Sequence, residues 1–198
     1  MPCGPTAKDV ALESSGGELR SKTIVITGGD TGLGFETARA LSAAGARLII
    51  LSHNATKGMA AAKHLAMLPL RVILCDFSKL SSVRAAAAEI LEETKEISVL
   101  MNNAGLLVGL KGLPNQTEDG FDRVVQVNFL GPLLLTELLM GRLRAARGRI
   151  IFVSSGASTV PCAWGFLAKN CTDLTGLSRA STLLRRTPPP GTNAMGFP

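Results

Sequence analysis

The stretch TIVITGGDTGLG, residues 23–34, joins an apolar run to a glycine-rich turn. Its β-branched start is typical of a buried strand, and a helical pattern begins at Thr31 and stops at Gly45. Glycine lets the backbone approach a phosphate closely, and a helix N-terminus offers free N–H groups. The turn therefore predicts a site for a dinucleotide pyrophosphate. The turn residues assigned to this site are Thr27, Gly28, Asp30, Thr31, Gly32, Leu33 and Gly34.

Strand-like and helix-like stretches alternate through residues 23–154. Strands are expected at 23–26, 47–51, 70–75, 97–101 and 149–154, and helices at 31–44, 55–68, 81–95 and 117–147, the last with a kink at residues 131–132. Apolar strands separated by helices indicate a parallel sheet covered on both faces. Right-handed crossovers then give an α/β, doubly wound, Rossmann-like fold of about five strands.

Composition divides the chain into three parts. Residues 1–22 lack an apolar signal-like region and are interpreted as a flexible tail. Residues 23–158 form the expected nucleotide-binding domain, and residues 159–198 an irregular Pro- and Gly-containing segment. No run approaches the ~20 apolar residues of a membrane span, and we expect a cytoplasmic protein.

Charge and cysteine usage argue against two classes of site. The net charge of +6 is scattered or placed at expected helix ends, so no nucleic-acid partner is expected. The four cysteines form no CxxC pair, and the two histidines complete no metal site with them, so no metal is expected either.

Four more motifs follow the glycine turn in order along the chain. Asp76 and Phe77 follow the third strand, NNAG (residues 102–105) ends the fourth, Asn128 lies in VNFLG (residues 127–131), and Ser155 ends the fifth. With TGxxxGxG, this series resembles the short-chain dehydrogenase/reductase family from residue 22 to about residue 158. Within that family it resembles the carbonyl reductase and retinol-dehydrogenase-like branches, which carry a long insertion before the family's tyrosine.

The resemblance implies hydride transfer between a nicotinamide cofactor and a small-molecule carbonyl or alcohol. It places Asp76 and Phe77 at the adenine and assigns Asn128 and Ser155 to the catalytic set. The NNAG residues it assigns to the cofactor are Asn103, Ala104 and Gly105. From the residues alone, Asp76 equally suits a cap of the next helix, Asn128 a solvent-facing position, and Ser155 a turn. The full-length relatives are expected to be homo-oligomers.

The end of the second strand bears on cofactor choice. NAD-preferring members place an acid there for the ribose hydroxyls, whereas this chain has Ser52, His53 and Asn54, all three assigned to the cofactor site. We therefore expect NADP in preference to NAD. His53 stands where NADP-preferring relatives often carry an arginine, although a solvent-exposed loop histidine is the preferred interpretation.

The chain contains no tyrosine, so the family's Y-x-x-x-K proton donor is missing. Lys169 has Gly165 where the tyrosine should stand. Three explanations remain open: a chain that ends before this motif after a long insertion, an aberrant end from splicing or a frameshift, and a tyrosine-free pseudoenzyme. The expected function is a short-chain oxidoreductase that is inactive as this chain. The alternative is a non-catalytic nucleotide-binding or interaction protein.

Overall fold

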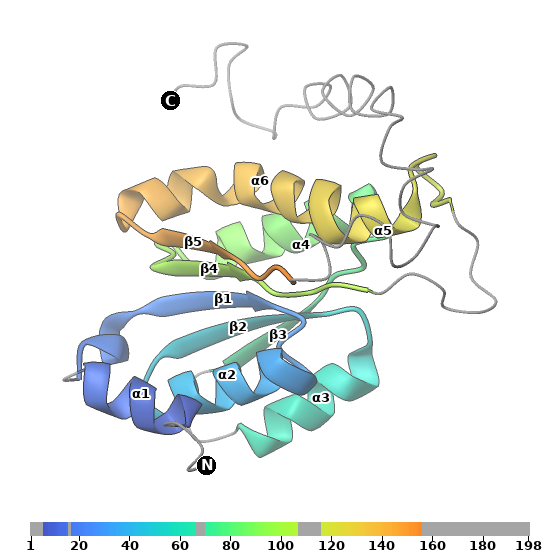
Figure 1. Cartoon of the computed structure of the whole chain (residues 1–198). Helices are drawn as coiled ribbons and strands as arrows, with labels where there is room; N and C mark the ends of the chain where they lie inside the picture. Colours follow the sequence, from blue (N-terminus) through green and yellow to red (C-terminus); the bar gives the residue numbers. More distant parts are fainter. Residues whose placement is uncertain (1–5, 16, 66–69, 107–115, 156–198) are drawn as a thin grey trace. The chain divides into compact units, whose positions relative to one another are not determined.

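The computed structural model describes residues 6–15, 17–65, 70–106 and 116–155 (Figure 1). In these ranges five parallel strands form one sheet in the order β3-β2-β1-β4-β5. The strands are β1 (Thr23–Thr27), β2 (Arg47–Ser52), β3 (Leu70–Leu74), β4 (Val99–Asn102) and β5 (Arg149–Phe152). Each strand end lies within two residues of the one expected from sequence.

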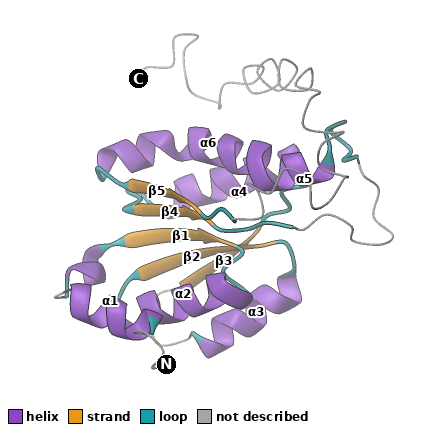
Figure 2. Cartoon of the chain, viewed as in Figure 1, coloured by secondary structure: helices purple, strands orange, loops and turns teal. Residues whose placement is uncertain are grey.

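Helices cover both faces of the sheet (Figures 1 and 2). On one face lie α1 (Ala7–Ser15), α2 (Gly32–Ala43) and α3 (Ala55–His64). On the other lie α4 (Leu80–Glu93), α5 (Arg123–Val125) and α6 (Gly131–Ala145), with a π-helix (Gln126–Leu130) between α5 and α6. This arrangement confirms the doubly wound α/β fold.

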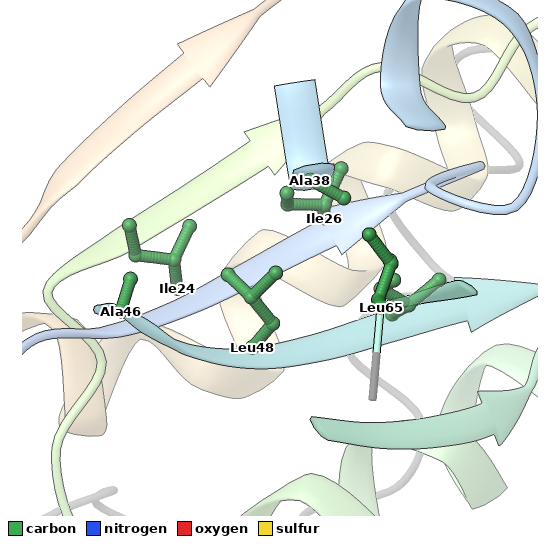
Figure 3. Close-up of a cluster of buried hydrophobic side chains, with 7 residues drawn as sticks. Ile24, Ile26, Ala38, Ala46, Leu48 and Leu65 are labelled. Atoms are coloured by element: carbon green, nitrogen blue, oxygen red, sulfur yellow. The ribbon is translucent and has the colours of Figure 1, made fainter. Parts of the chain in front are cut away.

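The core on the α2 face is aliphatic (Figure 3). Ile24 and Ile26 of β1 pack beside Leu48 and Ile50 of β2, and Ala38 of α2 lies over them. A small alanine lets the helix approach the β-branched strand residues closely. Each fully buried aliphatic side chain contributes about 1.5–3 kcal/mol, so this cluster fixes α2, and with it the glycine turn, against the sheet.

The strand order reverses direction at β1, which pairs with β2 on one side and β4 on the other. In open α/β sheets, ligands bind at such a switch point, outside the carboxyl ends of the strands. Here the residues that leave β1 and β4 are the glycine turn and the NNAG motif, so the topology brings the two motifs together.

The N-terminal region departs from the expected flexible tail. Residues 7–15 form α1, which contacts α2, and Glu18–Ser21 form a 3₁₀ turn. Thr6 and Asp9 act as a reciprocal cap: the Thr6 backbone N–H donates to Asp9 Oδ2 (2.9 Å), and the Asp9 N–H donates to Thr6 Oγ1 (3.3 Å). A capping box of this kind starts a helix in a segment that carries little apolar periodicity.

The long helix begins later than the sequence predicts. Residues 117–122 form a turn in which Gly120 has φ +83°. The carboxylate of Asp122 then accepts from the N–H groups of Val124 (2.9 Å) and Val125 (3.0 Å), so it is the N-cap. The irregularity expected at residues 131–132 is the π-helix Gln126–Leu130, just before them.

One helix has the length and composition of a membrane span, contrary to the expectation from the sequence. In the described part of the chain, the continuous helical stretch Arg123–Ala145 has 23 residues, and its most apolar 18-residue window has a mean hydropathy of 1.5. Half of its most apolar window is buried inside the fold, where it packs against α4 and β4. A helix that packs in a protein core can have the same length and composition as a membrane span, because its buried face is apolar.

The chain divides into two compact units, Met1–Val153 and Ser154–Pro198. Ser154 and Ser155 are described and are exposed. The expected irregular segment and the gap where Y-x-x-x-K would stand lie outside the described residues.

Strand β5 lies at an edge of the described sheet with apolar side chains open to solvent. Ile150, Ile151, Phe152 and Val153 are 38–52% exposed. Apolar strand edges pair with other chains. We therefore expect the 198-residue chain to self-associate through β5.

Phe152→Lys should reduce this association, because a charged side chain on the edge opposes pairing. Met59→Lys, on an exposed site of α3, is the control with the same charge change. Light scattering coupled to size-exclusion chromatography measures both. A monodisperse wild-type monomer would contradict the expectation.

Cys75, directly after β3, is a buried thiol. Burial, together with the negative charge of Asp76, raises its pKa to about 12 from 9.0. The native thiol therefore stays protonated at pH 8, and the free energy of unfolding should fall as the pH rises above 9.0, since only the thiol of the unfolded chain ionises there.

In a variant with Cys3, Cys162 and Cys171 replaced by Ser, a disulfide reagent should label Cys75 of the native chain far more slowly than Cys75 of the urea-unfolded chain. Equal rates would refute the burial.

Candidate functional site

The side chain of Asn103 joins the glycine turn to the end of β4. Its Nδ2 donates to the carbonyl oxygens of Thr27 (3.0 Å) and Gly28 (3.3 Å). In return, Thr27 Oγ1 accepts from the backbone N–H groups of Asn103 (2.9 Å) and Ala104 (2.8 Å). Thr27 is fully buried, so these bonds satisfy polar groups that water does not reach. The two motifs that the sequence singled out are therefore one unit.

Two glycines of the turn are required by this contact. A Cβ on Gly34 would overlap the Gly28 carbonyl oxygen and Asn103 Nδ2. Gly28 itself has φ +64°, and a Cβ there would lie 3.1 Å from the Ala104 Cα. Any side chain at either position would push the turn away from the NNAG segment.

Gly32 differs from both, because a Cβ there would meet no atom within 4 Å, although its φ is +57°. It is the first residue of α2, whose N-cap residue Thr31 makes no side-chain cap hydrogen bond. No N-cap side chain therefore occupies the first N–H groups of α2, which lie at the positive end of a helix of 12 residues. This is the geometry that binds phosphate groups.

Asp30 and Leu33 lie on either side of this helix start. Asp30 is buried, and its Oδ2 has no hydrogen-bond partner in the described part of the chain. A buried carboxylate oxygen without a donor costs about 1–3 kcal/mol or more, and a hydroxyl of a bound ligand would satisfy it. Leu33 is 79% exposed, which leaves an apolar surface beside the turn.

At the end of β2, two of the three assigned residues serve their own backbone. Ser52 Oγ donates to the Asn54 carbonyl (2.9 Å), and Asn54 Oδ1 accepts from the Lys57 N–H (3.0 Å) as the N-cap of α3. His53 is exposed at the same strand end. Of this group, His53 is exposed to solvent, which fits both a loop histidine and a contact to a cofactor phosphate.

After β3, Asp76 does not cap the following helix. Its Oδ1 accepts from the N–H (2.9 Å) and hydroxyl (2.7 Å) of Ser78, which forms a tight turn. The first N–H of α4, that of Leu80, instead reaches Asp119 Oδ2 (2.9 Å). Phe77 is buried, and a Cβ on Gly131 would lie 2.6 Å from its Cδ1. Phe77 therefore packs on the π-helix end rather than facing solvent.

Asn128 is exposed, but its amide is used. Its Oδ1 accepts from the Leu106 N–H (2.9 Å) and its Nδ2 donates to the Leu106 carbonyl (3.0 Å). This pair of bonds holds the segment just after NNAG against the π-helix. Ser155, the other residue assigned to catalysis, belongs to the second compact unit.

Sequence reasoning did not single out Gln126 and Asp119. Gln126 is fully buried and bonds to Phe77, Thr117 and Asp119. The sequence signal that was available is a polar residue two positions before Asn128 in a largely apolar stretch, and it belongs to no motif. Among the described residues, no three His, Cys, Asp or Glu side chains gather as metal ligands.

The two glycines of the helix start can be tested separately. Gly34→Ala should destabilise the fold, because its Cβ overlaps the Asn103 contact.

Gly32→Val should leave the fold in place, apart from about 1–2 kcal/mol of backbone strain, and remove binding of a dinucleotide. Gly17→Val, at φ +88° with open space around it, is the control for that strain. Calorimetric titration with NADPH and thermal melting separate the effects; unchanged affinity in folded Gly32→Val would refute the site.

Comparison with known proteins adds independent findings. A family profile described as short chain dehydrogenase matches residues 22–167. Retinol dehydrogenase 12 of Bos taurus is 40% identical over 146 residues, which cover 71% of this chain and 45% of that protein. The chain thus spans less than half the length of this relative.

Two solved structures are similar to the chain. A metagenomic short-chain oxidoreductase in complex with NADP has a TM-score of 0.64 and 30% identity, covering 85% of this chain and 78% of its own. The NADH-dependent reductase A1-R′, described as responsible for alginate metabolism, has a TM-score of 0.65 and 25% identity, covering 83% and 75%.

Proposed function

Because the chain belongs to the short chain dehydrogenase family, we propose that it binds a nicotinamide dinucleotide across the glycine turn and the NNAG segment. The observation that carries the proposal is the pairing of a locked turn with an open helix start: Asn103 fixes the turn, and the space at Gly32 stays free. The pyrophosphate would accept hydrogen bonds from the first N–H groups of α2. A ribose hydroxyl would donate to the unpaired Oδ2 of Asp30.

The proposed reaction is hydride transfer to or from a small-molecule carbonyl or alcohol. The nicotinamide supplies the hydride. The chain's own residues would bind and orient the cofactor and substrate. Asn128 holds the backbone of Leu106 and so fixes the segment that follows NNAG. Ser155 is the residue proposed to donate a hydrogen bond to the substrate oxygen, which stabilises developing negative charge there. The proton donor is the missing part, since the chain has no tyrosine.

We propose NADP in preference to NAD. The end of β2 carries no carboxylate to repel a 2′-phosphate, and His53 is exposed there. Titration with NADPH and NADH in parallel compares the two affinities. His53→Glu should lower the affinity for NADPH and leave that for NADH unchanged or higher, because it places an acid where the phosphate would lie.

The same proposal covers assembly and location. We propose a cytoplasmic enzyme, and the family resemblance implies that its full-length form is a homo-oligomer. A retinoid-like substrate is suggested by the name of the retinol dehydrogenase relative.

A second function is favoured by the lack of tyrosine: a non-catalytic protein that binds the nucleotide and has no turnover of its own. The two functions share the cofactor site and differ only in whether a proton donor acts beside it. Both functions predict that this chain alone is inactive, so the coding sequence beyond Pro198 separates them: an in-frame Y-x-x-x-K supports the oxidoreductase, and a stop codon supports the non-catalytic protein.

We expect the purified chain to bind the cofactor and to show no appreciable dehydrogenase activity. Loss of general acid–base catalysis costs about 10²–10⁴-fold in rate. NADPH oxidation in the presence of small aldehydes and ketones, followed by absorbance, tests this. Turnover by the wild-type chain that is lost in Ser155→Ala would refute the expectation that the chain is inactive. Absence of cofactor binding would refute the proposed function itself.

A further inference from the structure

The side chain of Gln126 connects three segments in the interior of the fold. Its Nε2 donates to the Phe77 carbonyl (3.3 Å) and to Asp119 Oδ2 (2.8 Å), and its Oε1 accepts from Thr117 Oγ1. Gln126 is fully buried. A buried amide whose partners are removed carries the full desolvation cost of its polar groups. The contacts therefore define one arrangement of these segments.

Asp119 extends the connection to the start of α4. Its Oδ2, besides accepting from Gln126, accepts from the N–H of Leu80, the first residue of that helix (2.9 Å). The N-cap residue of α4, Lys79, makes no side-chain cap bond of its own. A carboxylate at a helix N-terminus is also favoured by the helix dipole. Asp119 thus supplies from a distant loop the cap that the local sequence lacks.

This network, the Gln126 clamp (Thr117, Asp119, Gln126 and the Phe77 carbonyl), lies between two parts of the proposed site. On one side is the turn of Asp76 and Phe77, assigned to the adenine. On the other is the π-helix, in which Asn128 follows Gln126 by two residues and holds Leu106. All of these hydrogen bonds join protein atoms, so the Gln126 clamp forms without a bound cofactor.

We infer that Gln126 is a positioning residue, which sets the adenine-binding turn relative to the helix that carries Asn128. The inference rests on the proposed function for its consequence, but the clamp is a property of the protein alone. Without the amide, the Phe77 carbonyl and Asp119 lose a shared donor, and the turn is no longer fixed to the π-helix. Binding of the adenine half of the cofactor should weaken, while the nicotinamide half is unaffected.

The test compares Gln126→Met, which keeps the side-chain length and removes the amide, with Thr94→Val. Thr94 is also buried and bonds through its hydroxyl to the Glu96 carbonyl (2.8 Å), but it lies at the far end of α4. Affinities for AMP and for nicotinamide mononucleotide are measured by NMR titration, and stability by thermal melting. We expect AMP binding to weaken about tenfold in Gln126→Met and nicotinamide mononucleotide binding to stay the same.

A merely structural role predicts a different result. Thr94→Val should lower the melting temperature without changing either affinity, and if Gln126→Met behaves in the same way, the inference is overturned. Should Gln126→Met fail to fold, Asp119→Ala, which removes the oxygen that Leu80 and Gln126 share, is expected to weaken AMP binding in the same direction. Unchanged AMP affinity in folded Asp119→Ala also overturns the inference.

Hydrogen exchange distinguishes this inference from the proposed function. If the wild-type chain binds neither AMP nor a dinucleotide, the proposed function fails. The clamp is then judged without ligand: Asp119→Ala and Gln126→Met should speed amide exchange at residues 77–79 more than Thr94→Val does. Equal exchange in the variants and the control would overturn the clamp independently.

Discussion

The hydrogen bonds of the Asn103 side chain hold the rest of the proposed site in place. They tie the carbonyl oxygens of Thr27 and Gly28 to the segment after β4, while the Thr27 hydroxyl accepts two N–H groups of that same segment. Four bonds in a buried position leave little freedom between the two loops. Because Gly34 has no room for a Cβ beside them, the direction of α2 is set by the same contact. The open helix start at Gly32 follows from it.

The segment after β4 is held from its other side as well. Asn128 forms two hydrogen bonds with the backbone of Leu106, and the π-helix that carries Asn128 is in turn held by Gln126. The segment is thus fixed to the α2 face of the sheet by Asn103 and to the α6 face by Asn128. A ligand lying across the carboxyl ends of β1 and β4 would meet a segment that is held by hydrogen bonds from both sides. Preorganisation of this kind lowers the cost of ordering the site on binding.

The fold could be predicted from the sequence because its signals are local. Apolar runs such as residues 47–51 and 70–75 form strands wherever helices cover both faces, and Gly45 ends its helix by its own conformation, with φ +96°. The motif order also placed Thr27 and Asn103 in one site. The predictions that were wrong concern features set by specific side-chain contacts, which hydrophobic periodicity does not reveal. The capping pair of Thr6 and Asp9 makes a helix of a segment expected to be a tail.

Side-chain roles within the site were harder to predict for the same reason. Asp76 was equally suited to an adenine contact and a helix cap, and only the bond from Leu80 to Asp119, 39 residues away, removes the second. Asn54 and Ser52 suited a cofactor contact by position, yet both bond to their own turn. Gln126 carried no motif at all. Long-range hydrogen bonds between loops leave almost no trace in a single sequence, whereas the glycines that admit them do.

The central claim is that a dinucleotide lies across the turn that Asn103 holds. Titration of the ¹⁵N-labelled chain with NADPH, followed by NMR, tests it most directly. The account predicts the largest amide shifts at Gly32, Leu33 and Gly34 and at residues 103–105, with saturation at a single affinity. Shifts confined to other surfaces, or no shifts at a saturating concentration of a folded chain, would contradict it.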